Sequence, residues 1–326
     1  MKKRVLHFLI SFVLVFAFLF GGLNFSIQVD ASSGKVKLSA KKLYMLTTHL
    51  KVYPSIEIKN YTGYVQWTIE DDSVADIVYR EYGDTENSYT KSKTIYSNSK
   101  CFINPKSSGT TKITAEYDGG KITCKLYVSD RDEAEAKYIK TGKNPYKLSK
   151  DELKAAKAIK KSIKKMNKKK MNRVQKIRKV HEYIVKNCKY NYTAYYNQEM
   201  DFSDASIIGT MLKKTAVCEG YARTFRVYML AMGIPCKYVC GVTTIGNQGD
   251  HAWNMVKCSD GKWYHIDVTW DDPDNGPYAN YKYFLLTDKQ MKESRKWNYK
   301  DYPKCKGKKY RNYYTQDSEY NSKTYW

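Results

Sequence analysis

The sequence predicts an α+β protein in which an all-β sandwich precedes a domain of mixed helices and strands. Residues 35–130 alternate apolar and polar side chains in short runs separated by turn residues, which is the period of half-buried β-strands. Apolar residues then recur at helical spacing in three segments between residues 149 and 232. A second strand pattern follows at residues 249–273. About 295 residues remain once an N-terminal leader is set aside, a length that favours two domains.

The leader, residues 1–31, is predicted to be a secretory signal peptide rather than part of the fold. The basic start "MKKR" is followed by the sixteen-residue apolar run "VLHFLISFVLVFAFLF". This run is shorter than the ~20 residues that span a bilayer. The small residues of "VDA" at 29–31 suit a cleavage site before Ser32, with an uncleaved anchor as the alternative. We therefore expect a secreted protein.

The chain is strongly basic, with a formal net charge of +24. Loss of the leader removes three basic residues and one acidic residue and leaves +22. Net charge of this size bears on partners and solubility rather than on fold. Wall polymers and lipid head groups are the polyanions that an exported protein meets. We therefore expect cell-wall association through anionic wall polymer and no nucleic-acid partner, while the oligomeric state stays open.

The sandwich is assigned to residues 32–130. Its predicted strands are "GYVQWTI", "SVADIVY", "KCFINP", "TKITAEY" and "KITCKLYVSD". The sequence "YDGGK" at 117–121 predicts a hairpin between the last two, because glycines supply the positive φ of such turns. The stretches "KLSAKKLYML", "VQWTIEDDSVADI" and "PKSSGTTKITAEYDGGKITCKLYV" resemble the group-2 bacterial immunoglobulin-like domain. That resemblance implies a spacer or adhesion module and no particular activity.

Eight cysteines in an exported chain suggest disulfides, but their spacing is not that of a small stapled scaffold. Cys101 and Cys124 both fall on predicted sandwich strands, where they form either a disulfide or two separate buried thiols. Cys236 and Cys240 lie four residues apart on one predicted strand, roughly 13 Å, which is too far for a disulfide. Without a second CxxC or a His pair nearby, they do not indicate a zinc site.

Residues 131–150 are polar, include "TGKNP", and are predicted to be a linker to a second domain at 151–326. The first helix of that domain is capped by Ser149, with Asp151 and Glu152 at its positive end. The apolar stripe of this helix consists of Leu153, Ala156, Ile159, Ile163 and Met166. A second helix follows through Val174, Ile177, Val180 and Ile184.

Lysine occupies nine of the seventeen positions from 154 to 170. Such a run on one helix is either a solvated face or a contact for anionic wall polymer, and both readings stay open.

The stretch "TAVCEGYARTF" places Cys218 at the start of an amphipathic helix. The apolar stripe of this helix is Tyr221, Phe225, Tyr228 and Met232, and the pattern stops at "GIP", where Gly233 can cap the helix and Pro235 cannot continue it. The positive end of a helix favours a thiolate, and its free N–H groups can stabilise an oxyanion. Cys218 is therefore predicted to be a nucleophile, with a buried structural thiol as the alternative.

The segment "GDHAWNMVKCSDGKWYHIDVTWDDP" places His251 and Asp267 on two strands of one hairpin. A two-residue turn would put these side chains on opposite faces of the sheet. A three-residue loop at 259–261, with its glycine in the left-handed region, pairs Trp253 with Asp267 instead. His251 then lies on the same face, at a diagonal of ~7 Å. Asp267 would fix the imidazole tautomer and leave the other ring nitrogen for the thiol of Cys218.

These three segments resemble the motifs of the transglutaminase-like superfamily, which has a papain-like fold. Cys218 lies in "AVCEGYARTFRVYMLAMGIPCKYVCG", His251 in "DHAWNMV" and Asp267 in "WYHIDVTWDD", in the family order Cys, His, Asp. The resemblance implies that these residues are a catalytic triad and that acyl groups pass through a Cys218 thioester. The acceptor would be an amine (crosslinking) or water (deamidation or peptide hydrolysis). It also implies a protein or peptide substrate and no cofactor.

The alternative is a non-catalytic wall-binding or adhesion protein built on an inert transglutaminase-like scaffold. Retention of all three triad residues favours the enzyme.

Three further features are predicted near the triad. Family members often use an upstream aromatic or amide side chain as a second oxyanion donor, and "KYNYTAYYNQ" offers several such side chains. The acidic "WDDPDN" at 270–275 lacks a full calcium loop and is predicted to be a turn, so no metal is expected. His265 is predicted to be a strand residue rather than the base, and Trp253 and Trp270 to line the core or the cleft.

Overall fold

The computed structural model describes residues 34–47, 53–79, 90–97, 99–166, 170–246, 248–273 and 279–310. The predicted signal peptide, residues 1–31, lies outside the described residues. Among the described residues, none of the helices has the length and apolar character needed to cross a membrane.

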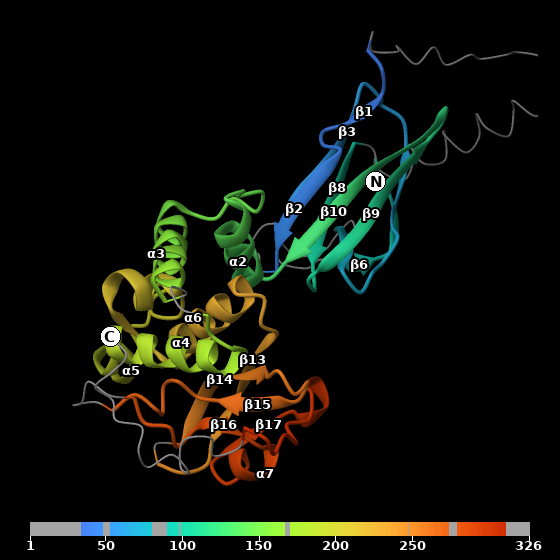
Figure 1. The fold of residues 1–326 in the computed structure, drawn as a ribbon. Helices are drawn as coiled ribbons and strands as arrows, with labels where there is room; N and C mark the ends of the chain where they lie inside the picture. Colours follow the sequence, from blue (N-terminus) through green and yellow to red (C-terminus); the bar gives the residue numbers. More distant parts are fainter. Residues whose placement is uncertain are drawn as a thin grey trace, which may run out of the picture.

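The N-terminal domain is made of two sheets with five described strands each (Figure 1). One sheet has the order β1 (Lys37–Leu38), β3 (Ser55–Lys59), β8 (Lys100–Pro105), β5 (Ala75–Tyr79) and β6 (Thr90–Ser92). The other has the order β2 (Lys42–Leu46), β10 (Gly120–Ser129), β9 (Gly109–Tyr117), β4 (Val65–Ile69) and β7 (Thr94–Ser97). Side chains from both sheets form one core that includes the fully buried Trp67. The two-sheet arrangement matches the predicted sandwich, and its immunoglobulin-like character stays a prediction.

The predicted hairpin at 117–121 is confirmed. Tyr117 pairs with Gly120, and Gly119 adopts a φ of +105° that other residues rarely take. Cys101 on β8 and Cys124 on β10 reach the shared core from opposite sheets, and both are free, buried thiols. Of the two alternatives for this pair, the structure therefore has the separate thiols.

The segment predicted as a linker, residues 131–150, is instead mostly helical. Helix α2 (Arg131–Thr141) is capped by the side chain of Asp130 and packs against the second domain (Figure 1). Its polar composition suggested an exposed linker, but its buried carboxylates face arginines of another helix. Asp132 is 1% exposed and lies 2.8 Å from Nη1 of Arg226. Ion pairing, which an apolar pattern does not report, holds this helix in place.

The two predicted helices that follow are confirmed. In α3 (Lys150–Met166), the Ser149 side chain accepts from the Glu152 N–H and Glu152 accepts from the Ser149 N–H, a reciprocal cap. In α4 (Arg173–Asn187), the four predicted apolar residues are all buried.

The second domain is built on a sheet with the order β16 (Phe284–Leu286), β15 (Trp263–Ile266), β14 (Gly249–Lys257), β13 (Cys236–Thr243) and β17 (Arg295–Trp297). Helices α4 and α6 (Cys218–Ala231) cover one face of it (Figure 1), and the main core lies between them and the sheet. A smaller core with Trp253 and Trp297 covers the other face. The remaining elements are β11 (Lys189–Tyr190), α5 (Tyr192–Asn197), a π-helical turn (Gly209–Lys213), β12 (Thr215–Ala216), α7 (Asp288–Met291) and a 3₁₀ turn (Tyr299–Asp301).

Candidate active site

Helix α6 begins at Cys218, as predicted. Its N-cap, Val217, has no side chain that could accept from the first turn, so the cap residue does not occupy the N–H groups at this end of the helix. The half-buried Cys218 therefore sits where the helix dipole and free N–H groups stabilise negative charge. Gly220 is needed in this turn, because a Cβ there would lie 2.4 Å from the carbonyl oxygen of Asp204. The glycine lets the preceding loop pack directly on the start of the helix.

The hairpin that presents the histidine and the aspartate has the predicted register. Asn254 pairs with Ile266 and Lys257 with Trp263, which continues to a pairing of Trp253 with Asp267. The turn closes with a 2.9 Å bond from the Cys258 N–H to the Lys262 carbonyl. Gly261 has a φ of +75°, the left-handed conformation predicted for it.

His251 and Asp267 meet as this register requires. The distance from Nε2 of His251 to Oδ2 of Asp267 is 2.7 Å, and both side chains are buried. The other carboxylate oxygen, Oδ1, accepts from the Trp270 N–H at 3.2 Å. Cys218 lies close enough to His251 to contribute to the pKa of the imidazole, so the structure brings the three predicted site residues together.

The electrostatics of this group favour an ion pair. Burial disfavours the imidazolium, but the charge and hydrogen bond of Asp267, together with Cys218, outweigh it and raise the pKa of His251 to about 9. Burial likewise disfavours the Asp267 carboxylate, yet His251 and Arg295 lower its pKa to about 2. His251 can thus be cationic at neutral pH.

Residues 157–268 match the family model of the transglutaminase-like superfamily, and the matched stretch includes Cys218, His251 and Asp267. This segment is a transglutaminase-like domain. Among curated proteins, none matches the chain.

Three solved structures show a distant likeness. One is a TGase, 21% identical over 48% of this chain, with a TM-score of 0.34, and the match spans only 43% of the TGase chain. Another is a protein from Cytophaga hutchinsonii, provisionally named a cysteine protease, 14% identical over 70% of this chain and 83% of its own, with a TM-score of 0.30. The third is the periplasmic domain of TgpA from Pseudomonas aeruginosa, 8% identical over 65% of this chain and 91% of its own, with a TM-score of 0.29.

One charged residue at the site was not predicted from the sequence. Arg295 on β17 is fully buried, and its Nη2 donates to Oδ2 of Asp267 at 2.7 Å. Its guanidinium carbon lies 3.7 Å from the ring centroid of Trp270. Arg295 lies in "SRKWN", which matches no motif, so its sequence context does not indicate a site residue. Only the strand order of the sheet places it near Asp267.

The upstream aromatic segment also contributes to the transglutaminase-like site. Strand β11 pairs in parallel with β12, which places Tyr190 opposite Ala216, two residues before Cys218. The Tyr190 phenol lies close enough to Cys218 for that residue to affect the pKa of the hydroxyl. Burial, and then the charge of Cys218, raise the pKa of Tyr190 well above its usual range, so the phenol keeps its proton. Of the side chains in "KYNYTAYYNQ", Tyr190 is therefore placed to donate to an oxyanion at Cys218.

Two tryptophans flank the histidine. The Trp253 ring stacks on His251 with centroids 6.0 Å apart and planes at 18°. The centroid of the Trp270 ring is also 6.0 Å from that of His251, and the two planes are tilted by 56°. Trp253 is 1% exposed and belongs to the smaller core, whereas Trp270 is only half-buried. Trp253 is therefore a core residue, and the role of Trp270 as a cleft wall stays a prediction.

The acidic turn after β15 is tied to the helices. Asp271 lies 3.0 Å from Nε2 of the buried His181, and Asp272 accepts at 2.6 Å from the hydroxyl of Tyr221. These contacts link the turn to α4 and α6, so both carboxylates bind protein groups.

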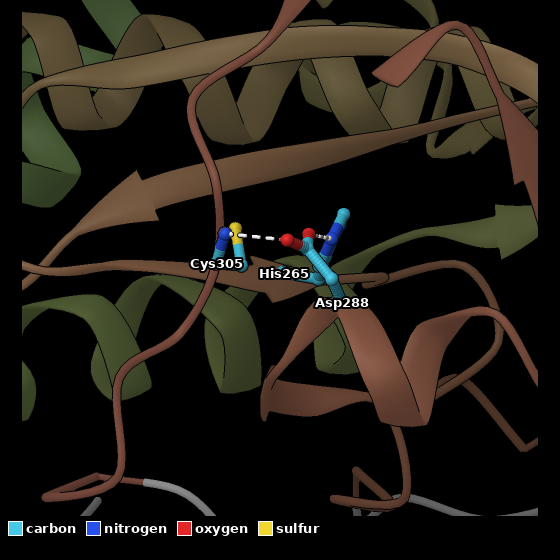
Figure 2. Close-up of side chains that lie close together, drawn as sticks. All are labelled: His265, Asp288 and Cys305. Carbon is cyan, nitrogen blue, oxygen red and sulfur yellow. Dashed lines mark hydrogen bonds and ion pairs between the residues drawn. The ribbon is translucent and has the colours of Figure 1, made fainter. Parts of the chain in front are cut away.

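Among the described residues, one cluster has the composition of a metal site. His265, Asp288 and Cys305 offer ligand atoms that all lie within 4.8 Å of one another (Figure 2). Nε2 of His265 lies 2.9 Å from Asp288, but Nδ1 accepts from the indole N–H of Trp253 at 3.0 Å. An indole can only donate, so Nδ1 has no proton and Nε2 carries it. The nitrogen that faces the cluster therefore has no lone pair for a metal, and His265 is the strand residue that was predicted.

Proposed function

We propose that the transglutaminase-like domain is a thiol acyltransferase in which Cys218 is the nucleophile. The observation that carries the proposal is the 2.7 Å contact between His251 Nε2 and Asp267, which leaves the other ring nitrogen available for the thiol. A His251 oriented in this way can hold a proton near the sulfur and return it to a leaving group.

The first half-reaction forms a thioester. The Cys218 sulfur attacks the carbonyl carbon of an amide, the C–N bond breaks, and the leaving amine takes its proton from Nδ1 of His251. The negative charge on the carbonyl oxygen would be stabilised by the Cys218 N–H, at the uncapped start of α6, and by the Tyr190 hydroxyl. In the second half-reaction an amine or water attacks the thioester, His251 accepts its proton, and the sulfur leaves.

The substrate is proposed to be a glutamine side chain or a peptide bond of a protein, and the site of action the cell surface. Both follow from the family resemblance and the leader, and the basic charge supports the second.

Incubation of the full mature chain with a glutamine-rich protein and a fluorescent amine tests the proposal. We expect covalent incorporation of the amine, deamidation or cleavage of the protein, and a thioester on Cys218 trapped by acid quench and mass spectrometry. Cys218→Ala should abolish all three. Cys240→Ala is the matched control, since Cys240 is exposed on β13 and should be dispensable. Equal product from the wild type and Cys218→Ala would remove the proposal.

The second candidate is a non-catalytic wall-binding protein, which one observation favours. The lysines of α3 at positions 154, 157, 160, 161, 164 and 165 are all exposed on its surface. In that case Cys218 should react with iodoacetamide no faster at neutral pH than Cys240 does. Selective alkylation of Cys218 would favour the enzyme.

A further inference from the structure

Arg295 and Asp267 form an ion pair that is wholly inside the protein. Each side chain is 0% exposed, and Nη2 lies 2.7 Å from Oδ2. A second guanidinium nitrogen, Nη1, donates to the Ser294 carbonyl at 3.0 Å. The ring centroids of Trp270 and Tyr283 lie 3.7 Å and 4.9 Å from the guanidinium carbon of Arg295. The two rings exclude water from the guanidinium group. A charge placed this deeply is stable only while its partner stays ionised.

The arginine shares its acceptor with the histidine. Oδ2 of Asp267 receives both Nε2 of His251 and Nη2 of Arg295, while Oδ1 receives the Trp270 N–H. Asp267 is therefore held by two cationic groups in the resting enzyme, of which only the histidine changes charge. Arginine remains protonated at every accessible pH.

The consequence appears after the thioester has formed. His251 has then given its proton to the leaving amine and is neutral, and it must stay neutral to accept the proton of the incoming amine or water. With Arg295 present, the buried group of neutral His251, ionised Asp267 and cationic Arg295 has no net charge. Without Arg295 the same state would carry an uncompensated negative charge in a dry site, which is costly. The His251–Asp267 pair would then take a proton from solvent, and His251 could no longer act as a base.

We propose that Arg295 is a positioning residue that keeps Asp267 ionised while His251 is neutral, and so supports the second half-reaction selectively. The inference rests on the proposed function and adds Arg295 to the residues of its site. The role is distinct from a purely structural one, because it predicts unequal effects on the two half-reactions and a change in pH dependence.

The test uses p-nitrophenyl acetate, whose burst of p-nitrophenolate reports acylation and whose steady state reports deacylation. In Arg295→Met we expect a full burst at pH 7.5 and a slower steady state. The apparent pKa of the pH–rate profile for deacylation should rise. At a pH below that pKa, the rate should fall about ten-fold for each unit by which the pKa rises. Arg295→Lys keeps the charge and should restore most of the deacylation rate. Lys296→Met, an exposed change on the same strand, is the matched control.

Equal slowing of both half-reactions in a folded Arg295→Met protein would overturn the inference. So would an unchanged apparent pKa in the pH–rate profile for deacylation. A measurement on the wild type covers the case in which the variant does not fold. With Cys218 blocked by methyl methanethiosulfonate, ¹⁵N NMR should show His251 neutral and protonated on Nε2 at pH 10, above its folded pKa of about 9. A His251 that stays cationic there contradicts the proposal. If the wild type gives no burst, or Cys218→Ala gives the same burst, the proposed function fails instead.

Discussion

The indole N–H of Trp253 donates to Nδ1 of His265 across 3.0 Å, and this contact sets which nitrogen of the buried imidazole carries the proton. Nε2 then donates to Asp288, whose other oxygen accepts from the Cys305 N–H at 2.9 Å. Burial lowers the pKa of His265 and keeps the ring neutral. The result is a continuous hydrogen-bonded chain from the tryptophan that stacks on His251 to the backbone at Cys305.

A first prediction follows for metals. In the wild type, zinc or a chelator should leave the melting temperature unchanged, because Nε2 of His265 has no free lone pair. Trp253→Phe removes the donor and allows the tautomer with a proton on Nδ1, so zinc should stabilise this variant through His265, Asp288 and Cys305. Without zinc, Trp253→Phe should lose about 1–3 kcal/mol of folding stability from the unpaired Nδ1. Calorimetry with and without zinc measures both effects, and zinc stabilisation of the wild type would contradict the tautomer assignment.

The register of the hairpin could be predicted from the sequence, whereas the contacts that Arg295 and helix α2 make could not. One glycine in a three-residue loop fixed the strand register, and register alone decides whether His251 and Asp267 share a face. Arg295 follows Asp267 by 28 residues and reaches it from a strand on the opposite side of the sheet, a relation that no local pattern encodes. Helix α2 was missed for a related reason, since part of its buried surface is charged and the arginine partners of these carboxylates and of its cap Asp130 lie 91 to 96 residues away.

A second prediction concerns the stability of the buried ion pair. Asp267→Asn leaves the Arg295 cation buried without a carboxylate and should cost about 3–5 kcal/mol of folding free energy. The double change Asp267→Asn with Arg295→Met removes both charges and should be more stable than the sum of the single changes predicts. Urea unfolding of the four proteins gives the coupling energy directly. Additive losses would show that the two side chains do not interact in the folded state.

The third prediction is the pH dependence of stability. The folded pKa of His251 is raised to about 9 from 6.5, so its stabilising contribution is complete below about pH 6.5 and disappears as the pH rises through 9. The folded pKa of Asp267 is lowered to about 2 from 3.8, so its contribution is complete above about pH 3.8 and disappears as the pH falls through 2. The stability difference between the wild type and His251→Gln should therefore shrink between pH 6.5 and 9. In a Cys218→Ala background this decline should be smaller, because Cys218 helps to raise the histidine pKa.

The fourth prediction tests where the second domain begins. Arg226 is 8% exposed and binds Asp130 and Asp132, both at 2.8 Å, so its charge depends on residues at the junction of the two domains. A chain that begins at residue 130 keeps these partners and should fold and turn over small substrates. A chain that begins at residue 143 lacks α2 and should lose about 3–5 kcal/mol or fail to fold, because the cation is left buried and unpaired. Circular dichroism melts of the two chains compare them. Equal stability would mean that α2 contributes nothing to the second domain.

The last prediction concerns the exposed lysines of α3. Exposed charges are screened over ~8 Å at physiological ionic strength, so attachment to an anionic wall polymer through them must weaken steeply as salt rises. Replacing Lys160, Lys161, Lys164 and Lys165 with glutamine should reduce retention on purified cell walls and leave the p-nitrophenyl acetate burst intact. The matched control replaces four exposed lysines of the sandwich, at positions 37, 59, 100 and 121, and has the same net charge. If both quadruple variants lose retention equally, total charge rather than the helix binds the wall. If retention survives the α3 change and high salt together, α3 is a solvated face and the sandwich becomes the candidate anchor.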